Sequence, residues 1–138
     1  MNKPANINPV RVAELVVILS AALAILLAVN HFAQKSARDA KRISDIQSIA
    51  STLELNYDNR GSSYEKIEPG MFKTGTLPKD PQQGIRACNS RLCTYCFRDG
   101  GGFCSDTDRK LADFTPSPKF TVCANLESGG YFCRSSQR

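Results

Sequence analysis

The chain has 138 residues, of which 41% are hydrophobic and 22% charged, and its 18 Lys or Arg against 13 Asp or Glu give a net charge of +5. This length allows one ordinary domain, or an anchor and a small domain, and the mild positive charge marks no nucleic-acid surface. The single histidine, His31, excludes Ser/His/Asp and Cys/His catalytic sites in the rest of the chain, so we expect no enzyme and no cofactor.

Two segments at the N-terminus predict a retained membrane anchor. Residues 1–9 are polar, contain two prolines and indicate a short leader-like end on the cytoplasmic side. Residues 10–33 follow, and from Leu15 to Ala33 they contain no Asp, Glu, Lys or Arg. About 20 apolar residues suffice for a transmembrane helix. Basic residues follow this run instead of a small-residue cleavage signature, which argues against a removed signal peptide.

One acid, Glu14, lies just inside the start of the apolar run. A charge at the centre of a membrane costs about 2.5–3.5 kcal/mol on insertion scales. Glu14 is therefore either shallow enough to reach the lipid head groups or in need of a partner. Arg11 lies three residues before it, a spacing at which the two side chains can pair on one helix.

The helical pattern continues past the membrane as an amphipathic stem, residues 34–57. No Gly or Pro interrupts the chain between Val10 and Gly61. Apolar residues recur at steps of three and four, at Ala33, Ala37, Ala40, Ile43, Ile46, Ile49, Ala50, Leu53 and Tyr57. Charged residues cover the rest of this helix, at Lys35, Arg38, Asp39, Lys41, Arg42 and Asp45. We expect one helix of about 48 residues, roughly 70 Å long, with the apolar stripe facing a partner.

Residues 58–138 form the predicted head, a small antiparallel β-sheet. Strand signals at 92–97 and 103–105 flank RDGGG, and signals at 119–126 and 131–134 flank ESGG, so two hairpins are expected. Alternation along 119–126 gives one apolar face that should pack on the stem. The predicted fold class is α+β, with one long helix on a small sheet.

Six cysteines lie between Cys88 and Cys133, an even number in a small loop-rich segment. This pattern indicates disulfides and an oxidising compartment outside the cytoplasm. A three-residue turn in the second hairpin sets Cys123 opposite Cys133. Opposition across RDGGG favours Cys96–Cys104, which leaves Cys88–Cys93.

Two other uses of these residues stay open. CTYC (93–96), with two of the later cysteines, would suit a zinc site of four thiolates, or it would be a redox pair. Head acids would suit calcium, namely Asp80, Asp99, Asp106 and Asp108. We expect disulfides and no metal.

Four stretches together resemble type IV pilins and the related type II secretion pseudopilins. They are Glu14 with the following LVVILSAALAILLAV, the stem 37–64, LPKDP at 77–81, and FTVCANLESGGYFC at 120–133. The resemblance implies a lollipop with a long helix and a small head, held in the cytoplasmic membrane by lipid and then polymerised into a surface filament.

The resemblance also implies partners and a role for the acid. Copies of the chain and the pilus or secretion assembly machinery are the expected partners, and nucleic acid is an unsupported one. In the filament core Glu14 would pair with the N-terminal amine of a neighbouring subunit. Two alternatives remain: a type II secretion pseudopilin, and a monomeric anchored module whose cysteine-rich head binds metal or a partner.

The chain departs from the family pattern at four places. The leader junction, which usually ends in glycine, corresponds to Pro9–Val10, and position 11, usually small or polar, is Arg11. Leu23 and His31 fall near the places where the family helix carries a glycine and a proline. The resemblance implies cleavage at Pro9–Val10 whereas the proline disfavours it, and we expect a straighter, more continuous helix.

Overall fold

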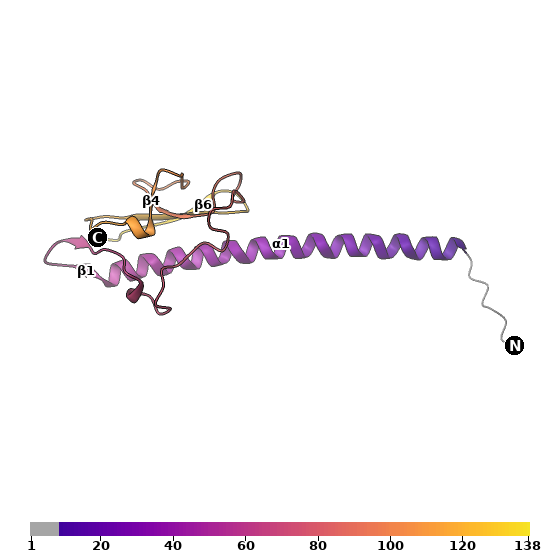
Figure 1. Cartoon of the computed structure of the whole chain (residues 1–138), viewed down its shortest axis with the longest axis horizontal. Coiled ribbons are helices and arrows are strands. Elements are labelled where there is room, and N and C mark those ends of the chain that lie inside the picture. Colours follow the sequence, from indigo (N-terminus) through magenta and orange to yellow (C-terminus); the bar gives the residue numbers. More distant parts are fainter. Residues whose placement is uncertain (1–8) are drawn as a thin grey trace. The chain divides into compact units, whose positions relative to one another are not determined.

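One long helix runs through both the anchor and the stem. The computed structural model describes residues 9–138, and the leader-like residues 1–8 lie outside the described part. Helix α1 (Pro9–Leu55) is unbroken (Figure 1). Pro9 suits the first helical position because a backbone N–H there would have no helical partner. The chain divides into two compact units, Met1–Gln34 and Lys35–Arg138, so the stem half of α1 shares a unit with the sheet.

Helix α1 ends two residues earlier than the stem segment predicted from the sequence. The side-chain amide of Asn56 donates to the carbonyl of Thr52 at 2.8 Å, and its backbone N–H also points at the last helical carbonyls. Asn56 thus satisfies carbonyls that a helix end leaves free. Tyr57, expected in the helix, instead begins strand β1 (Tyr57–Asp58), which pairs antiparallel with β2 (Ser63–Tyr64).

A four-stranded antiparallel sheet forms the rest of the regular structure, in the order β4-β3-β5-β6. Its strands are β3 (Tyr95–Phe97), β4 (Arg109–Lys110), β5 (Thr121–Asn125) and β6 (Tyr131–Ser135). Two short 3-10 helices, η1 (Pro69–Met71) and η2 (Leu111–Asp113), lie in the connections. The predicted α+β class is therefore confirmed.

The second predicted hairpin is present, and the first is not. Strands β5 and β6 pair with Cys123 opposite Cys133, as the turn geometry predicts. Residues 103–105 form no strand, and β3 pairs instead with β4 and β5. Gly100, Gly101 and Gly102 all have positive φ (78°, 76° and 122°), a conformation that suits glycine and turns the chain away from the ladder.

A buried side chain replaces the missing strand partner of residue 104. The backbone N–H of Cys104 donates to the Asn125 side chain at 2.8 Å, and its carbonyl accepts from the same amide at 2.9 Å. The amide also donates to the carbonyl of Leu92 at 2.9 Å. Asn125 thus provides hydrogen-bond partners for backbone groups that no neighbouring strand pairs with.

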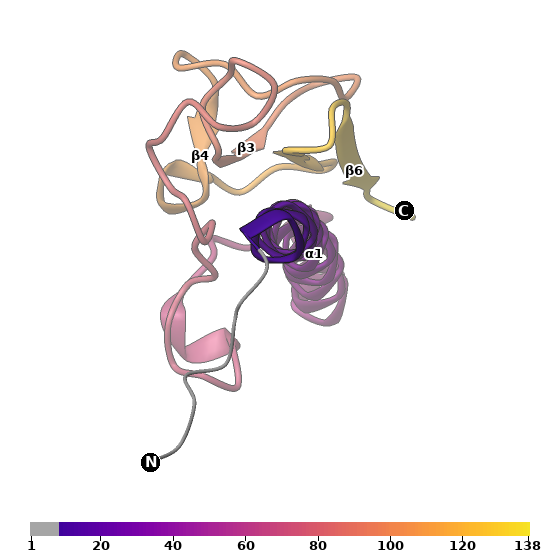
Figure 2. The same cartoon turned by 90° about the vertical axis from the view of Figure 1, so that its right-hand side faces the viewer.

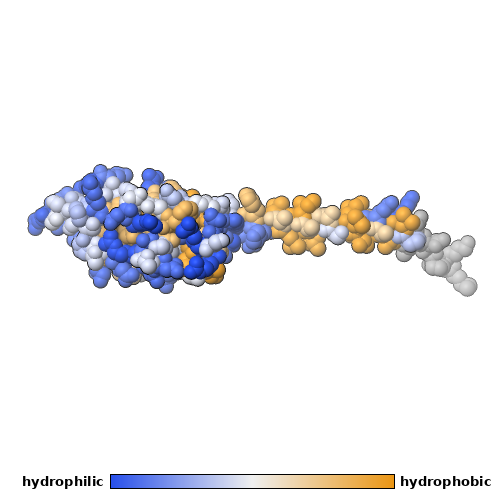
Figure 3. Space-filling view, turned by 90° about the horizontal axis from the view of Figure 1, so that it is seen from above, coloured by the Kyte–Doolittle hydropathy of each residue, from blue (hydrophilic) through white to orange (hydrophobic). Residues whose placement is uncertain are grey.

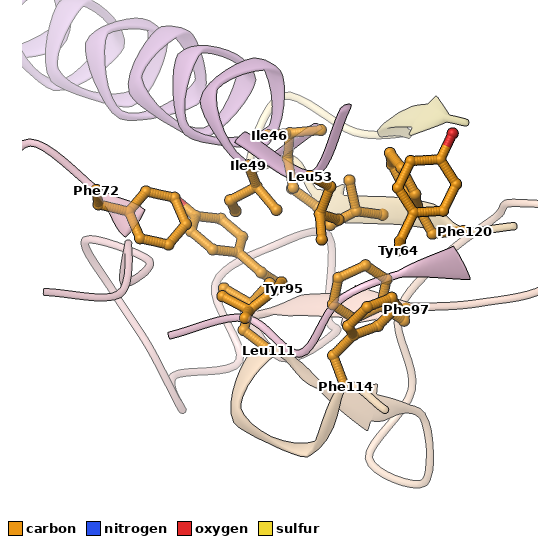
Figure 4. Close-up of a cluster of buried hydrophobic side chains, with 13 residues drawn as sticks. Ile46, Ile49, Leu53, Tyr64, Phe72, Tyr95, Phe97, Leu111, Phe114 and Phe120 are labelled. Carbon is orange, nitrogen blue, oxygen red and sulfur yellow. The ribbon is translucent and has the colours of Figure 1, made fainter. Parts of the chain in front are cut away.

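The sheet packs on the stem half of α1 through an apolar core. Viewed along the helix, the sheet covers one side of this half and the segment with η1 passes along another (Figure 2). Ile46, Ile49 and Leu53 of α1 point into a cluster of aromatic rings, which come mainly from the sheet and its connections (Figure 4). The expected apolar face of residues 119–126 joins this core through Val122 and Ala124 of β5 and through Phe120, which directly precedes the strand. The core explains why a sheet with strands this short is stable.

Candidate functional site

The first half of α1 exposes nearly all of its apolar side chains. The large hydrophobic residues from Val10 to Phe32 are between 43% and 74% exposed. The most apolar window of the helix has a mean hydropathy of 2.8 and no buried share, and Figure 3 shows apolar residues over the face of this half that it draws. By length and composition the helix is able to cross a membrane. Apolar surface of this extent marks an interaction with lipid or protein.

Two opposite charges interrupt this surface near its start. Arg11 and Glu14 lie on consecutive turns of α1, and both are exposed. Neither makes an ion pair with any residue from 9 to 138, including the other. The own-helix pairing that the spacing allows is thus not formed. Pro9 and Val10, the candidate cleavage junction, lie in the first turn of the helix.

The stem half contains a cluster of fully paired charges, centred on Arg42. The side chain of Arg42 is 0% exposed. Its Nε and Nη2 donate to the two carboxylate oxygens of Asp80 at 2.7 and 2.9 Å. Its Nη1 donates to Asp39 Oδ1 at 2.8 Å and to Glu127 Oε1 at 2.7 Å. One guanidinium therefore joins α1, the LPKDP loop and the turn between β5 and β6.

The carboxylates around Arg42 have further donors. Arg38 binds Glu127 through both Nε and Nη2, each at 2.8 Å. The backbone N–H groups of Glu127 and Ser128 donate to the two oxygens of Asp39 at 2.8 and 2.9 Å. Such bidentate and charge-assisted hydrogen bonds are the strong ones, and they offset the desolvation of buried charges. We call the five residues Arg38, Asp39, Arg42, Asp80 and Glu127 the junction cluster.

The surroundings of the junction cluster keep its members charged. Burial opposes the charge of Arg42, but the three carboxylates, Asp80 foremost, outweigh it and raise the pKa of the guanidinium. Burial also opposes the charge of Asp39, but the hydrogen bonds it accepts, first from Ser128, hold its pKa below the usual value. The hydrogen bonds from Arg38 lower the pKa of Glu127 against the effect of burial.

The charge pattern predicts Asp39 and Arg42 on the solvent side of the stem, and this prediction is wrong. The buried positions of α1 are Asp39, Arg42, Ile46, Ile49 and Leu53. They follow steps of three and four, so the charged pair continues the stripe of the isoleucines toward the N-terminus. Ala37 and Ala40, assigned to the stripe by hydrophobicity, are exposed. The spacing alone would have found the buried face, whereas the polarity of the residues concealed it.

All six cysteines form disulfides: Cys88–Cys93, Cys96–Cys104 and Cys123–Cys133. These are the pairs that the cysteine spacing favours, but the predicted opposition of Cys96 and Cys104 across a hairpin is wrong. Cys96 lies opposite Lys110 and Cys123 in the sheet, so Cys96–Cys104 ties a loop to a strand and is no cross-strand bond. A zinc site or a redox pair at CTYC would need thiols that these bonds consume.

Three of the four acids proposed for calcium have protein partners, and Asp99 is exposed without one among residues 9–138. Asp80 belongs to the junction cluster, Asp106 lies 3.3 Å from Arg86, and Asp108 accepts from the backbone N–H of Ser105 at 2.7 Å. Within residues 9–138, no group of three or more potential metal ligands comes together. Of the sites predicted from the sequence, the structure thus brings together the cysteines and leaves Glu14 and Arg11 apart.

No family model, curated protein or solved structure matches the chain.

Proposed function

We propose that the chain is a structural subunit that polymerises through its N-terminal helix into a type IV pilus-like filament. The observation that carries the proposal is an uncovered apolar half of α1, continuous with a stem half that is built into a folded head. In this proposal the subunit first sits in the cytoplasmic membrane with its head outside. Pilus or secretion assembly machinery then moves it from lipid into a bundle of identical helices.

The energetics of the apolar half favour such a transfer. Fully burying one Val, Leu, Ile or Phe side chain contributes about 1.5–3 kcal/mol relative to water, so the segment must be covered by lipid or by other helices. Lipid tails are as apolar as leucine, so helix association needs close packing and polar contacts in addition. A carboxylate at Glu14 supplies a polar contact that a simple anchor does not need.

The disulfides support the extracytoplasmic side of the proposal. Three disulfides in 104 residues, Lys35–Arg138, are typical of small domains in oxidising compartments. They would hold the head together once it is outside the cell. The proposed localisation is therefore a single-pass membrane protein whose head and, after assembly, whose filament lie at the surface.

Electron microscopy of filaments sheared from cells that express the full chain and its assembly machinery tests this function. Antibody against the head should decorate the filaments. Glu14→Ala should reach the membrane fraction at wild-type level but yield few filaments, because the buried polar contact is lost. Glu65→Ala is the matched control, since Glu65 is an exposed acid of the head, and it should assemble normally.

Three outcomes would count against the proposal. Filaments without this chain, or a chain that stays monomeric in the membrane, would favour the anchored binding module. Short periplasmic fibres in place of surface filaments would favour the pseudopilin. Wild-type filament yield from Glu14→Ala would show that the acid only reaches the lipid head groups. Mass spectrometry of the filament subunit would establish whether it begins at Met1 or Val10.

A further inference from the structure

Arg11 and Glu14 are the only Lys, Arg, Asp or Glu residues between positions 9 and 34, and they have opposite signs. Both are exposed on the uncovered half of α1 and have no ion-pair partner among residues 9–138. The junction cluster shows the opposite arrangement, in which every charge of the buried stem is paired. If the apolar half packs against another surface, Arg11 and Glu14 therefore need oppositely charged partners there.

A pair within one helix is a poor solution for these two residues. Oppositely charged side chains on one helix interact better when the acid precedes the base, and here Arg11 precedes Glu14. Arg11 also lies in the first turn, where the positive end of the helix dipole disfavours a cation. These two effects agree with the absence of an Arg11–Glu14 ion pair in the described structure.

A second copy of the chain offers both missing partners at once. We propose that Glu14 of one subunit pairs with Arg11 of a neighbouring subunit when the apolar halves pack together, an inference that rests on the proposed function. The surface of each helix start is then self-complementary in charge. A buried charge is strongly destabilising alone and tolerable when paired, so this contact would select the register of packing.

The helix geometry restricts the pair to small staggers between neighbouring subunits. Subunits inserted in the same membrane have parallel helices, and three residues correspond to about 4.5 Å along the axis. Packed helices lie about 8–10 Å apart, a gap that an arginine and a glutamate can bridge together. Neighbours at nearly the same height place Arg11 one turn from Glu14 of the adjacent helix. A stagger of about 4.5 Å would set the two charges level, whereas a stagger of several turns would place the charges of one subunit against apolar residues of the other.

Charge reversal in separate chains tests an intermolecular pair. The Arg11→Glu chain carries two acids and the Glu14→Arg chain carries two bases, so each alone should lose about tenfold or more in filament yield. Co-expression of the two should restore filaments that contain both chains, which differently tagged heads would show. The double variant Arg11→Glu/Glu14→Arg should assemble with itself. Glu65→Arg, on the head, controls for net charge.

Neutral variants keep the test decisive if the reversed chains do not insert. Arg11→Gln and Glu14→Gln should each reduce yield, and the double variant should assemble better than either, because it buries no unpaired charge. Wild-type yield from Arg11→Gln would overturn the pair and favour a neighbour's N-terminal amine as the partner of Glu14. Failure of co-expression to restore filaments, with wild-type filaments intact, would overturn the pair and leave the proposed function standing. If the wild-type chain forms no filaments, both fail.

Discussion

The two halves of α1 treat charge in opposite ways. In the apolar half, Arg11 and Glu14 are exposed and make no ion pair within residues 9–138. In the stem half, Asp39 and Arg42 are buried, and each side chain has several hydrogen-bond partners. The stem half shows that a charged side chain buried in this protein is surrounded by oppositely charged and hydrogen-bonding groups. Burial of Arg11 and Glu14 would require similar partners. The two halves thus differ in whether their charged side chains have partners among residues 9–138.

The same comparison holds for apolar residues. Ile46, Ile49 and Leu53 are covered by the sheet, whereas the aliphatic residues before Ala33 have no cover in the described part of the chain. Propensity does not distinguish these segments, since both are continuous helix. The cover does, because most helix stability in proteins comes from tertiary packing of one face.

The largest effect on stability is expected from breaking the junction cluster. Arg42→Met keeps an aliphatic side chain but leaves Asp39, Asp80 and Glu127 with only Arg38 as a nearby cation. Removing one member of a buried ion cluster costs about 3–5 kcal/mol. Urea unfolding of the full chain in detergent, followed by circular dichroism, would measure the loss. Lys41→Met removes an equal charge from an exposed i,i+4 pair on the same helix and should cost under about 1 kcal/mol; equal effects of both substitutions would contradict the role of the cluster.

A second prediction compares covered and uncovered leucines two residues apart. Leu53 is 1% exposed in the core, and Leu55 is 86% exposed at the helix end. Leu53→Ala should destabilise the head by about 2–5 kcal/mol through lost burial and a cavity. Leu55→Ala should change the free energy of unfolding by less than about 0.5 kcal/mol. A cost for Leu55→Ala as large as that for Leu53→Ala would mean that another surface covers the end of α1.

The disulfides should differ in how much each contributes to the free energy of unfolding. Replacing Cys123 and Cys133 by Ser together should cost about 2–4 kcal/mol. Replacing Cys88 and Cys93 should cost about 0.6 kcal/mol less, because the first bond closes 10 residues and the second 5, and each doubling of a loop adds about that amount. Urea midpoints under non-reducing conditions would rank the two variants, and peptide mapping would verify the pairs. The reverse ranking would show that the Cys88–Cys93 loop supports more than its own closure.

Periodicity and turn geometry predicted much of this fold from the sequence. The apolar run, the stem spacing and the second hairpin with Cys123 opposite Cys133 needed only local rules. The first hairpin failed because three glycines and the side chain of Asn125 redirect the loop, and no strand signal contains that information. The junction cluster was missed because Arg42 meets its partners 38 and 85 residues along the chain. Local hydrophobicity then assigns a buried arginine to the surface.

The last prediction concerns the stability of the head as a function of pH. The effect should be small near neutral pH and appear only in acid. The pKa values of Asp39 and Glu127 are lowered in the folded chain, so their stabilisation is complete above the unfolded values of about 4 and disappears as pH falls through the lowered folded values. The melting temperature of the head should therefore stay nearly flat from pH 8 to about 5 and fall below about 4.

Matched variants test whether this loss of stability at low pH comes from the junction cluster. Arg42→Met, already without the central cation, should show a shallower fall below pH 4 than the wild-type chain, because less ionic stabilisation remains to be lost. Glu65→Gln, an exposed acid outside the cluster, should follow the wild-type profile. If the melting temperature of Arg42→Met fell as steeply below pH 4 as that of the wild-type chain, the pH dependence would come from other carboxylates. The paired charges of the stem half would then not account for its stability.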